Sequence, residues 1–311
     1  MLDFLYDSTT LSSALRLAIP LIFAAIGGCF CDRAGVFNIA LECFMLCAAF
    51  FAALGTYLTV NPYVGVLCGI AAGLVCAALF GVFVFHLGSS GIVVSIAMNL
   101  SAWGLTTLLM LSFFGMRGSF ISNRLVSLPV IRMSFLEKIP YIGKIFGNQN
   151  LLVYLGLVMI FVMWFVMYKT TFGLRLRGVG MNPTASQATG ISTLKYRWIA
   201  TLITGAFCGV GGAVLPIGGT SIFSENMTAG RGFLAVAALL VAKGNPLSAG
   251  LFCLLFAYTD AASLRLQNLG IPSQLVETLP YLTTILVLVI AGVRVTLSKR
   301  RQHVLKREAE A

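Results

Sequence analysis

Five side chains that could contact a polar solute recur at helical spacing in two apolar stretches of the 311-residue chain. Asn38 and Glu42 are four residues apart, so on a helix their side chains share one face. Ser95 and Asn99 repeat this spacing, and Trp103 lies one turn further along. These donors, acceptors and aromatic surface could line a transport path. Polar groups at this spacing also hydrogen-bond neighbouring membrane helices, so both interpretations stay open.

Ionisable side chains inside a bilayer are costly and are therefore candidates for function. Glu42 has a second interpretation, because it could pair with Arg33 near the end of the preceding apolar stretch. Asp260 and Arg265 stand close to a predicted segment end, where water can solvate them. They are weaker candidates than Glu42 for this reason.

Residues for hydrolytic or metal chemistry cannot be assembled from this sequence. It has two histidines, one of them in the C-terminal tail, which leaves no Ser/His/Asp, Cys/His or metal-ligand set. The pairs Cys29/Cys31 and Cys43/Cys47 could be imagined as a metal cluster, but thiols are ordinary small apolar side chains in a helix. We expect no catalytic residue, no bound cofactor and no metal.

The elements that must position the candidate residues are membrane helices. Apolar residues make up 59% of the chain, charged residues only 10%, and the mean hydropathy is +0.95. A soluble domain has roughly 25% charged residues, and a helix needs about 20 apolar residues to cross a bilayer. The predicted fold class is therefore an all-α polytopic membrane protein. The 32 glycines suit close packing of such helices.

About nine apolar segments are predicted to form transmembrane or half-membrane helices within a membrane domain of residues 1–296. They span residues 11–31, 36–59, 63–87, 91–114, 150–170, 197–218, 233–243, 247–264 and 279–296. The segment 233–243 is too short for a straight crossing, so we expect a half-helix or one arm of a broken hairpin. Residues 297–311 form a basic tail.

The distribution of lysine and arginine predicts the orientation of the chain. The loop from Lys169 to Arg197 contains Arg175, Arg177 and Lys195 without an acidic residue, and the tail is basic as well. Cytoplasmic loops are enriched in these residues, so both regions belong in the cytoplasm and the N-terminus outside. The net charge of +11 does not indicate nucleic-acid binding, because the basic residues form no single surface.

The stretch 115–150 conflicts with this rule. It would be external, although it carries five basic residues and one acidic residue. Moving it to the cytoplasmic side would displace the other loops. Its mixture of apolar residues and prolines predicts short interfacial helices rather than a free loop.

The segment 171–196 carries the signals of a short exposed helix. Asn182 is a good N-cap, Pro183 suits the first helical position, and Gly190 suits the left-handed residue beyond the end. A helix of about two turns is marginal alone in water, so we expect it to dock on something. The alternative is a solvated connector whose basic residues only set the orientation.

The sequence GLRLRGVGMNPTASQATGIS in this segment resembles the cytoplasmic loop of bacterial ABC importer permeases in the family that serves simple sugars, nucleosides and branched-chain amino acids. Further blocks, DRAGVFNIALE, SGIVVSIAMNL and GRGF followed by KGNPL, are similar to the nucleoside branch in particular. Taken in order, these blocks cover nearly the whole chain.

The resemblance implies a type II ABC importer-like permease of the bacterial inner membrane that translocates a nucleoside. Such permeases pair into a dimer, often of two different subunits, and each places a cytoplasmic helix in a cleft of an ATPase subunit. An extracytoplasmic solute-binding protein, which can be a lipoprotein, delivers the solute. The resemblance gives the coupling role to Arg175, Arg177, Asn182, Pro183, Ala185 and Gly190.

ATP would be used by a separate chain. The sequence has no G-x-x-x-x-G-K-[ST] motif to cradle ATP phosphates, so ATP and magnesium would belong to the ATPase subunit and this chain is not expected to be an enzyme. A simple sugar such as ribose or galactose is the alternative solute. A secondary transporter is an alternative of another class, but its ion site needs carboxylates near the midplane, whereas the acidic residues here cluster near segment ends.

Overall fold

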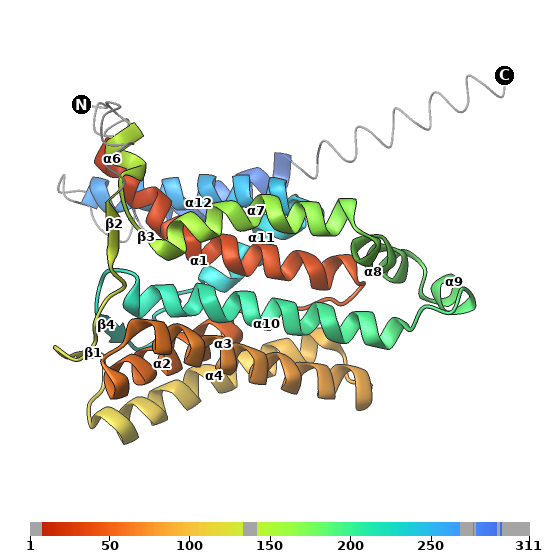
Figure 1. The fold of residues 1–311 in the computed structure, drawn as a ribbon, viewed down its shortest axis with the longest axis horizontal. Coiled ribbons are helices and arrows are strands. Elements are labelled where there is room, and N and C mark those ends of the chain that lie inside the picture. Colours follow the sequence, from red (N-terminus) through yellow and green to blue (C-terminus); the bar gives the residue numbers. More distant parts are fainter. Residues whose placement is uncertain (1–7, 133–141, 268–275, 277, 291–292, 294–311) are drawn as a thin grey trace.

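The structure, a computed structural model, describes residues 8–132, 142–267, 276, 278–290 and 293 (Figure 1). Its helices are α1 (Ser8–Arg33), α2 (Leu41–Thr59), α3 (Pro62–Gly81), the π-helix η2 (Val82–His86), α4 (Gly91–Phe114), α6 (Ile142–Phe146), α7 (Leu151–Lys169), α8 (Thr171–Met181), α9 (Pro183–Ala188), α10 (Thr193–Ile217), α11 (Arg231–Val241) and α12 (Pro246–Gln267). Another apolar helix spans Leu279–Ile290. The strands are β1 (Ser119–Ile121), β2 (Val130–Arg132), β3 (Asn148–Asn150) and β4 (Ile222–Ser224).

Seven of the described helices are long and apolar enough to cross a membrane: α1, α2, α3 with η2, α4, α7, α10 and α12. The other two predicted segments, 233–243 and 279–296, coincide with the shorter apolar helices α11 and Leu279–Ile290. The predicted all-α polytopic fold is confirmed. Length and composition support seven full spans in the described residues, and the count of about nine transmembrane or half-membrane helices stays a prediction.

Helix α1 lies at the centre of the bundle and packs against α7, α10, α11 and α12 (Figure 1). In its most apolar window 89% of the residues are buried, compared with 22% in α4. Both helices are apolar all round, but α1 meets protein on every side whereas α4 leaves most of its surface for lipid or another chain. The pattern of residues alone does not distinguish these two situations.

Helices α3 and α10 approach each other backbone to backbone. A Cβ on Gly73 would lie 2.2 Å from the Gly205 carbonyl oxygen, and a Cβ on Gly205 would lie 2.5 Å from the Gly73 carbonyl oxygen. Only residues without a side chain permit this distance. Lipid supplies no hydrophobic drive for helix association, so such close contact is a main source of packing energy in a membrane.

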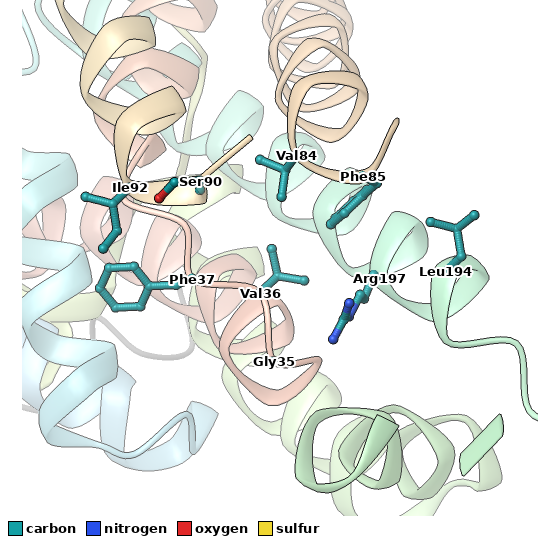
Figure 2. A pocket seen from close by; sticks show the side chains of 10 residues that line it. Gly35, Val36, Phe37, Val84, Phe85, Ser90, Ile92, Leu194 and Arg197 are labelled. Carbon is teal, nitrogen blue, oxygen red and sulfur yellow. The ribbon is translucent and has the colours of Figure 1, made fainter. Parts of the chain in front are cut away.

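The chain between the helices is irregular in two neighbouring places. Residues 34–40 join α1 to α2 without regular structure, and α3 changes into the π-helix η2 before the chain turns into α4. Together with the beginning of α10, these parts border an open cavity of about 390 Å³ (Figure 2). Irregular backbone at a helix end is tolerated where it lines such a cavity or faces protein.

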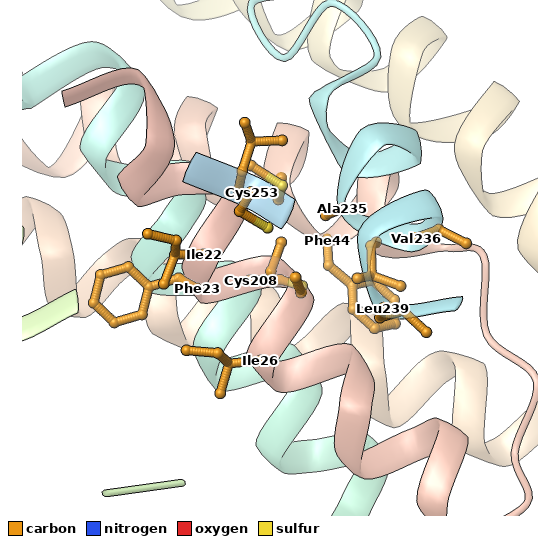
Figure 3. Close-up of a cluster of buried hydrophobic side chains, with 14 of the residues drawn as sticks. Ile22, Phe23, Ile26, Phe44, Cys208, Ala235, Val236, Leu239 and Cys253 are labelled. Atoms are coloured by element: carbon orange, nitrogen blue, oxygen red, sulfur yellow. The ribbon is translucent and has the colours of Figure 1, made fainter. Parts of the chain in front are cut away.

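The hydrophobic core is formed by buried side chains from helices that are far apart in sequence. Figure 3 shows part of it, where α1, α2, α10, α11 and α12 meet. Ile22, Phe44, Cys208, Leu239 and Cys253 come one from each of these helices, and each is at most 4% exposed. The half-helix α11 is therefore held inside the bundle by apolar packing on both of its sides.

The prediction of interfacial helices for 115–150 is wrong for most of its described residues; residues 133–141 lie outside the described part. Strand β1 pairs with β4, with Phe120 opposite Phe223, and β2 pairs with β3, with Ile131 opposite Gln149. The side chains of Phe120, Phe223 and Ile131 are types that suit strands, and the partner strands satisfy the backbone groups. Figure 1 shows the strands at the end of the bundle opposite to α8 and α9.

Candidate functional site

The carboxylate of Glu42 binds the beginning of the half-helix α11. Glu42 is 7% exposed. Its Oε1 accepts hydrogen bonds from the Thr228 hydroxyl and, at 3.0 Å, from Gly230 N, and its Oε2 accepts one at 2.6 Å from Gly232 N. The free N–H groups and the positive dipole end of a helix favour a negative charge there. The alternative prediction that Glu42 pairs with Arg33 is wrong, because the Glu42 carboxylate binds the N-terminus of α11 instead.

Ser95 and Asn99 of α4 bind the backbone at the beginning of α2. Ser95 Oγ accepts from Ile39 N at 3.1 Å. Asn99 Oδ1 accepts from Cys43 N at 3.0 Å, and its Nδ2 donates to the Ile39 carbonyl at 3.1 Å. Residue Ala40 at the N-cap of α2 supplies no side-chain cap, so α4 satisfies backbone groups that α2 leaves unpaired. This arrangement is the interhelical clasp that the sequence left open as an alternative.

Trp103 lies apart from this clasp. Its side chain is 55% exposed, whereas Ser95 is fully buried. Two helical turns separate them, and the turn of the helix carries Trp103 away from the face that meets α2. The structure thus brings Asn38, Glu42, Ser95 and Asn99 together around the break between α1 and α2 and leaves Trp103 outside that group.

Asn38 keeps an unused donor. Its Oδ1 accepts a hydrogen bond from Ala40 N at 2.7 Å, but its Nδ2 is buried and has no hydrogen-bond partner among the described residues. A small cavity of about 10 Å³ lies beside it, bordered by Asp32, Phe37 and Leu239. That volume is about what one water molecule needs. All five predicted path residues are described by the structure. Among them, only Asn38 has a buried polar atom without a hydrogen-bond partner.

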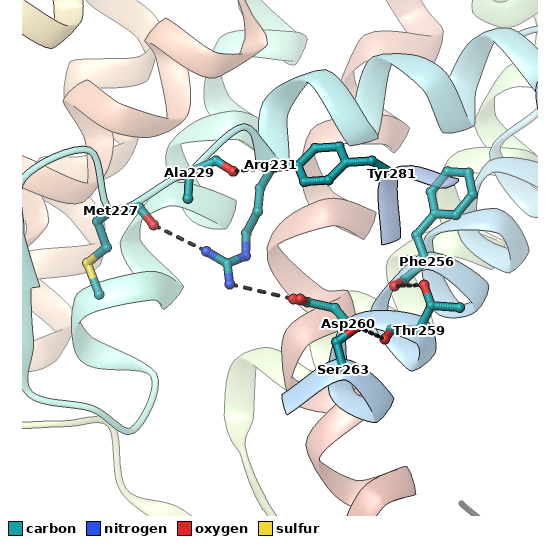
Figure 4. Close-up of polar contacts among 8 residues, drawn as sticks. All are labelled: Met227, Ala229, Arg231, Phe256, Thr259, Asp260, Ser263 and Tyr281. Carbon is teal, nitrogen blue, oxygen red and sulfur yellow. Dashed lines mark hydrogen bonds and ion pairs between the residues drawn. The ribbon is translucent and has the colours of Figure 1, made fainter. Parts of the chain in front are cut away.

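An ion pair joins α11 to α12 beside the Glu42 contact (Figure 4). Arg231 Nη2 lies 3.7 Å from Asp260 Oδ2, and Arg231 Nη1 donates to the Met227 carbonyl at 3.2 Å. Their side chains are 23% and 31% exposed, and the expectation that water reaches Asp260 stays a prediction. Arg265 donates to the Thr9 hydroxyl at 2.6 Å. Such partly exposed pairs contribute little stability but fix geometry.

The predicted short helix in 171–196 is confirmed as α9. The Asn182 side chain accepts from Ala185 N at 3.0 Å, Pro183 occupies the first turn, and Gly190 has φ +80°. Ser186 is the one buried residue in α9. Figure 1 shows α9 protruding from one end of the bundle. Arg175, Asn182, Ala185 and Gly190 are exposed there and are available to a partner.

The eleven-residue helix α8 that carries α9 was not predicted. It lies against the end of α1, where a Cβ on Gly180 would be only 2.1 Å from the Arg33 carbonyl oxygen. Arg33 also donates to the Gly244 carbonyl at 3.2 Å and to the Tyr168 hydroxyl at 3.0 Å. The Arg177 guanidinium lies 4.8 Å from the centre of the Tyr168 ring. Arg177 therefore faces the bundle, unlike Arg175.

Sequence reasoning missed the residues that hold α8 in place. Gly180 falls inside the block that carries the family resemblance, so its lack of a side chain was a usable signal. Gly244 falls inside the KGNPL block and carried the same signal, whereas Tyr168 carries none, because its role depends on helices that meet only in the folded chain. The same applies to Thr228, which donates to Glu42.

Three thiols form the one group of potential metal ligands found in the described residues. The Sγ atoms of Cys43, Cys47 and Cys76 all lie within 4.8 Å of one another, between α2 and α3. Thiolates are the donors that soft metal ions prefer. The sequence showed the first two as a pair four residues apart but could not show the third.

Known proteins that this chain resembles are named as permease components of transport systems. The family model described as "Branched-chain amino acid transport system / permease component" matches residues 10–289. The nucleoside ABC transporter permease protein NupC of Lactococcus lactis subsp. cremoris is 36% identical over 90% of each chain. The putative glucose ABC transporter permease protein TsgC13 of Haloferax volcanii is 31% identical over 91% of this chain and 92% of its own. The guanosine ABC transporter permease protein NupQ of Bacillus subtilis is 32% identical over 90% and 91%.

Proposed function

This chain belongs to the family of branched-chain amino acid transport system permease components, and we propose that it is the membrane permease subunit of an ABC importer for a nucleoside. The seven membrane-length helices and the relatives named as ABC transporter permeases support the permease assignment. The relatives named for nucleosides and for guanosine support the solute. The relative named for glucose supports a simple sugar as the second candidate.

The contact between Glu42 and α11 favours an uncharged solute. A half-helix whose N-terminus points into a transporter commonly binds an anionic group of the solute. Here the Glu42 carboxylate already occupies that position with three hydrogen bonds. A second carboxylate, as on an amino acid, would be repelled. Nucleosides and simple sugars have no such charge, so this feature supports either of them over an amino acid.

In this proposal the solute path passes the break between α1 and α2. Asn38 has an unused amide donor there. Glu42, Ser95 and Asn99 shape the wall by fixing the beginnings of α11 and α2. Trp103 offers an aromatic face further along α4, where a base or a sugar ring can stack.

The observation that carries the coupling mechanism is the capped, protruding helix α9 at the end of α8. In our proposal α9 docks in a cleft of the ATPase subunit through its exposed face, and α8 transmits the movement to α1. The exposed Arg175, with Asn182, Pro183, Ala185 and Gly190, belongs to the docking surface, and Arg177 anchors α8. ATP and magnesium are used by the ATPase subunit.

The proposal includes an orientation in the membrane and two further partners, a solute-binding protein and a second permease subunit. The α8–α9 end faces the cytoplasm, because the loop from Lys169 to Arg197 carries Arg175, Arg177 and Lys195 without an acidic residue. The strands at the other end then face outward and meet the solute-binding protein. The N-terminus lies outside and the basic tail inside. A second permease subunit of the same type completes the pore.

The energy source tests this function. Cells that express the complete transporter are given labelled guanosine while an uncoupler removes the ion gradients and glycolysis maintains ATP. We expect uptake to continue under the uncoupler and to stop when ATP is depleted. Uptake that follows the gradient and not ATP would identify a secondary transporter.

Competition with unlabelled ribose, galactose and guanosine then identifies the solute, and inhibition by a sugar alone would favour the second candidate.

A further inference from the structure

The open cavity between the ends of α3, α4 and α10 combines one arginine with an apolar wall (Figure 2). Its volume is about 390 Å³. Six of its ten lining residues have apolar side chains, among them Val84, Phe85, Ile92 and Leu194. Figure 2 shows the Arg197 guanidinium reaching from α10 toward segment 35–37. An arginine surrounded by apolar residues indicates a ligand with an anionic group and an apolar part.

Arg197 has one buried N–H donor that no other described residue uses. Its Nε is buried and makes no hydrogen bond to any described residue. No carboxylate lines the cavity. Buried polar atoms are nearly always paired, and an exception requires an explanation. A guanidinium presents its N–H groups in a planar fork that matches two oxygens of a phosphate.

The rest of the polar lining agrees with an anion. Ser90 stands at the N-cap of α4, but its hydroxyl makes no capping hydrogen bond. Lys195, exposed two residues before Arg197, does not line the cavity. A phosphate in this cavity would therefore meet donors and no negative charge from the lining residues.

The cavity lies at the ends of three membrane-length helices, the level at which lipid head groups would be expected. It is bordered by the last residues of the α3–η2 span and the first residues of α4 and α10. Gly35, on its rim, contacts Gly180 of α8, which places the cavity at the α8–α9 end of the bundle. Basic pockets between helix ends are a known kind of site for anionic lipid head groups.

We propose that this cavity binds the phosphate ester of an anionic phospholipid from the adjoining leaflet. Arg197 and the Ser90 hydroxyl bind the phosphate, and Val84, Phe85 and Ile92 contact the first part of an acyl chain. The apolar wall favours a lipid over a soluble phosphate. The lipid then links α4 and α10 to the residues that carry α8, so the composition of the membrane affects the stability of the coupling end.

The test uses the purified permease complex in detergent, titrated with short-chain phosphatidylglycerol while its melting temperature is recorded. We expect stabilisation of the wild type and an apparent affinity roughly tenfold lower for Arg197→Gln, because a charged hydrogen-bonding partner is lost. Arg197→Lys keeps the charge and is expected to retain most of the binding. Lys195→Gln, which removes a neighbouring charge outside the cavity, serves as the matched control.

Three results would overturn the proposal. One is equal stabilisation of wild type and Arg197→Gln by phosphatidylglycerol. Another is equal stabilisation by phosphatidylcholine, whose head group has no net charge, because this would show that filling the apolar space is sufficient. The third is equal stabilisation by adenosine monophosphate or inorganic phosphate, which would assign the site to a soluble phosphate. Retained binding in Arg197→Lys supports the proposal even if Arg197→Gln fails to fold.

Discussion

The backbone N–H of Gly232 donates to the Glu42 carboxylate at 2.6 Å, although 190 positions separate the two residues in the chain. The contact is so close that a Cβ on Gly232 would lie 2.5 Å from the Glu42 backbone. One charged side chain on α2 thereby fixes where the half-helix α11 begins. Because this buried carboxylate accepts three hydrogen bonds, Glu42 has a structural role in positioning α11 and is also a candidate for contact with the solute.

Glu42→Ala is expected to destabilise the membrane domain. The substitution leaves the Gly230 and Gly232 N–H groups and the Thr228 hydroxyl without their acceptor, at a cost of about 2–4 kcal/mol. Glu42→Gln keeps one acceptor oxygen and should lose less. The melting temperature in detergent measures both. Thr228→Val, which removes a single donor, is the control, and a wild-type melting temperature for Glu42→Ala would contradict this role.

Asn99→Leu is expected to loosen α4 from α2. It removes the hydrogen bonds to Cys43 N and to the Ile39 carbonyl, and a loss of about 1–3 kcal/mol follows from the unpaired backbone groups. Trp103→Leu should leave the melting temperature unchanged, because Trp103 is 55% exposed. Measuring guanosine uptake of both variants separates the roles. Reduced uptake by a stable Trp103→Leu protein would support stacking of the solute, and unchanged uptake would remove Trp103 from the path.

Asn182→Ala is expected to uncouple ATP hydrolysis from transport. The N-cap contributes about 1 kcal/mol to a helix of only six residues, so α9 would fray. Asn182→Asp retains a capping oxygen and should behave like the wild type. The measurement is the amount of solute taken up per ATP hydrolysed in proteoliposomes with all subunits. If Asn182→Ala keeps the wild-type ratio at an unchanged melting temperature, α9 is only a connector.

Gly180→Ala is expected to separate α8 from α1 and to uncouple transport as well. The new Cβ would lie 2.1 Å from the Arg33 carbonyl oxygen, so one of the two helices must shift. Gly178→Ala, two residues away on the same helix, is a closely matched control, since its Cβ would make only an ordinary 3.7 Å contact with Ser186 Oγ. The same uptake-to-ATP ratio is measured for both. Identical ratios in the two variants would show that the α8–α1 contact carries no movement.

Local signals in the sequence were enough to predict α9. Asn182, Pro183 and Gly190 act through backbone groups within a few residues, so their meaning does not depend on the rest of the fold. Apolar length identified the long spans for a similar reason, and it also identified 233–243 as too short to cross.

Long-range pairing was out of reach of the sequence. The partner of Glu42 comes from the beginning of α11, and Arg33, the nearer choice along the chain, binds Gly244 and Tyr168 instead. Strand β1 forms because β4, about a hundred residues later, supplies its hydrogen bonds. The helical spacing of Ser95 and Asn99 was readable, but whether they face a pore or a neighbouring helix depends on packing.

The reciprocal contact of Gly73 and Gly205 restricts how this subunit can diverge. Neither position has room for a methyl group, and each is blocked by the carbonyl oxygen of the other. Substitution at one residue cannot be compensated at the other, because no smaller residue exists. In an alignment of permeases with this fold, we therefore expect glycine at both positions even where the exposed residues of α4 differ completely.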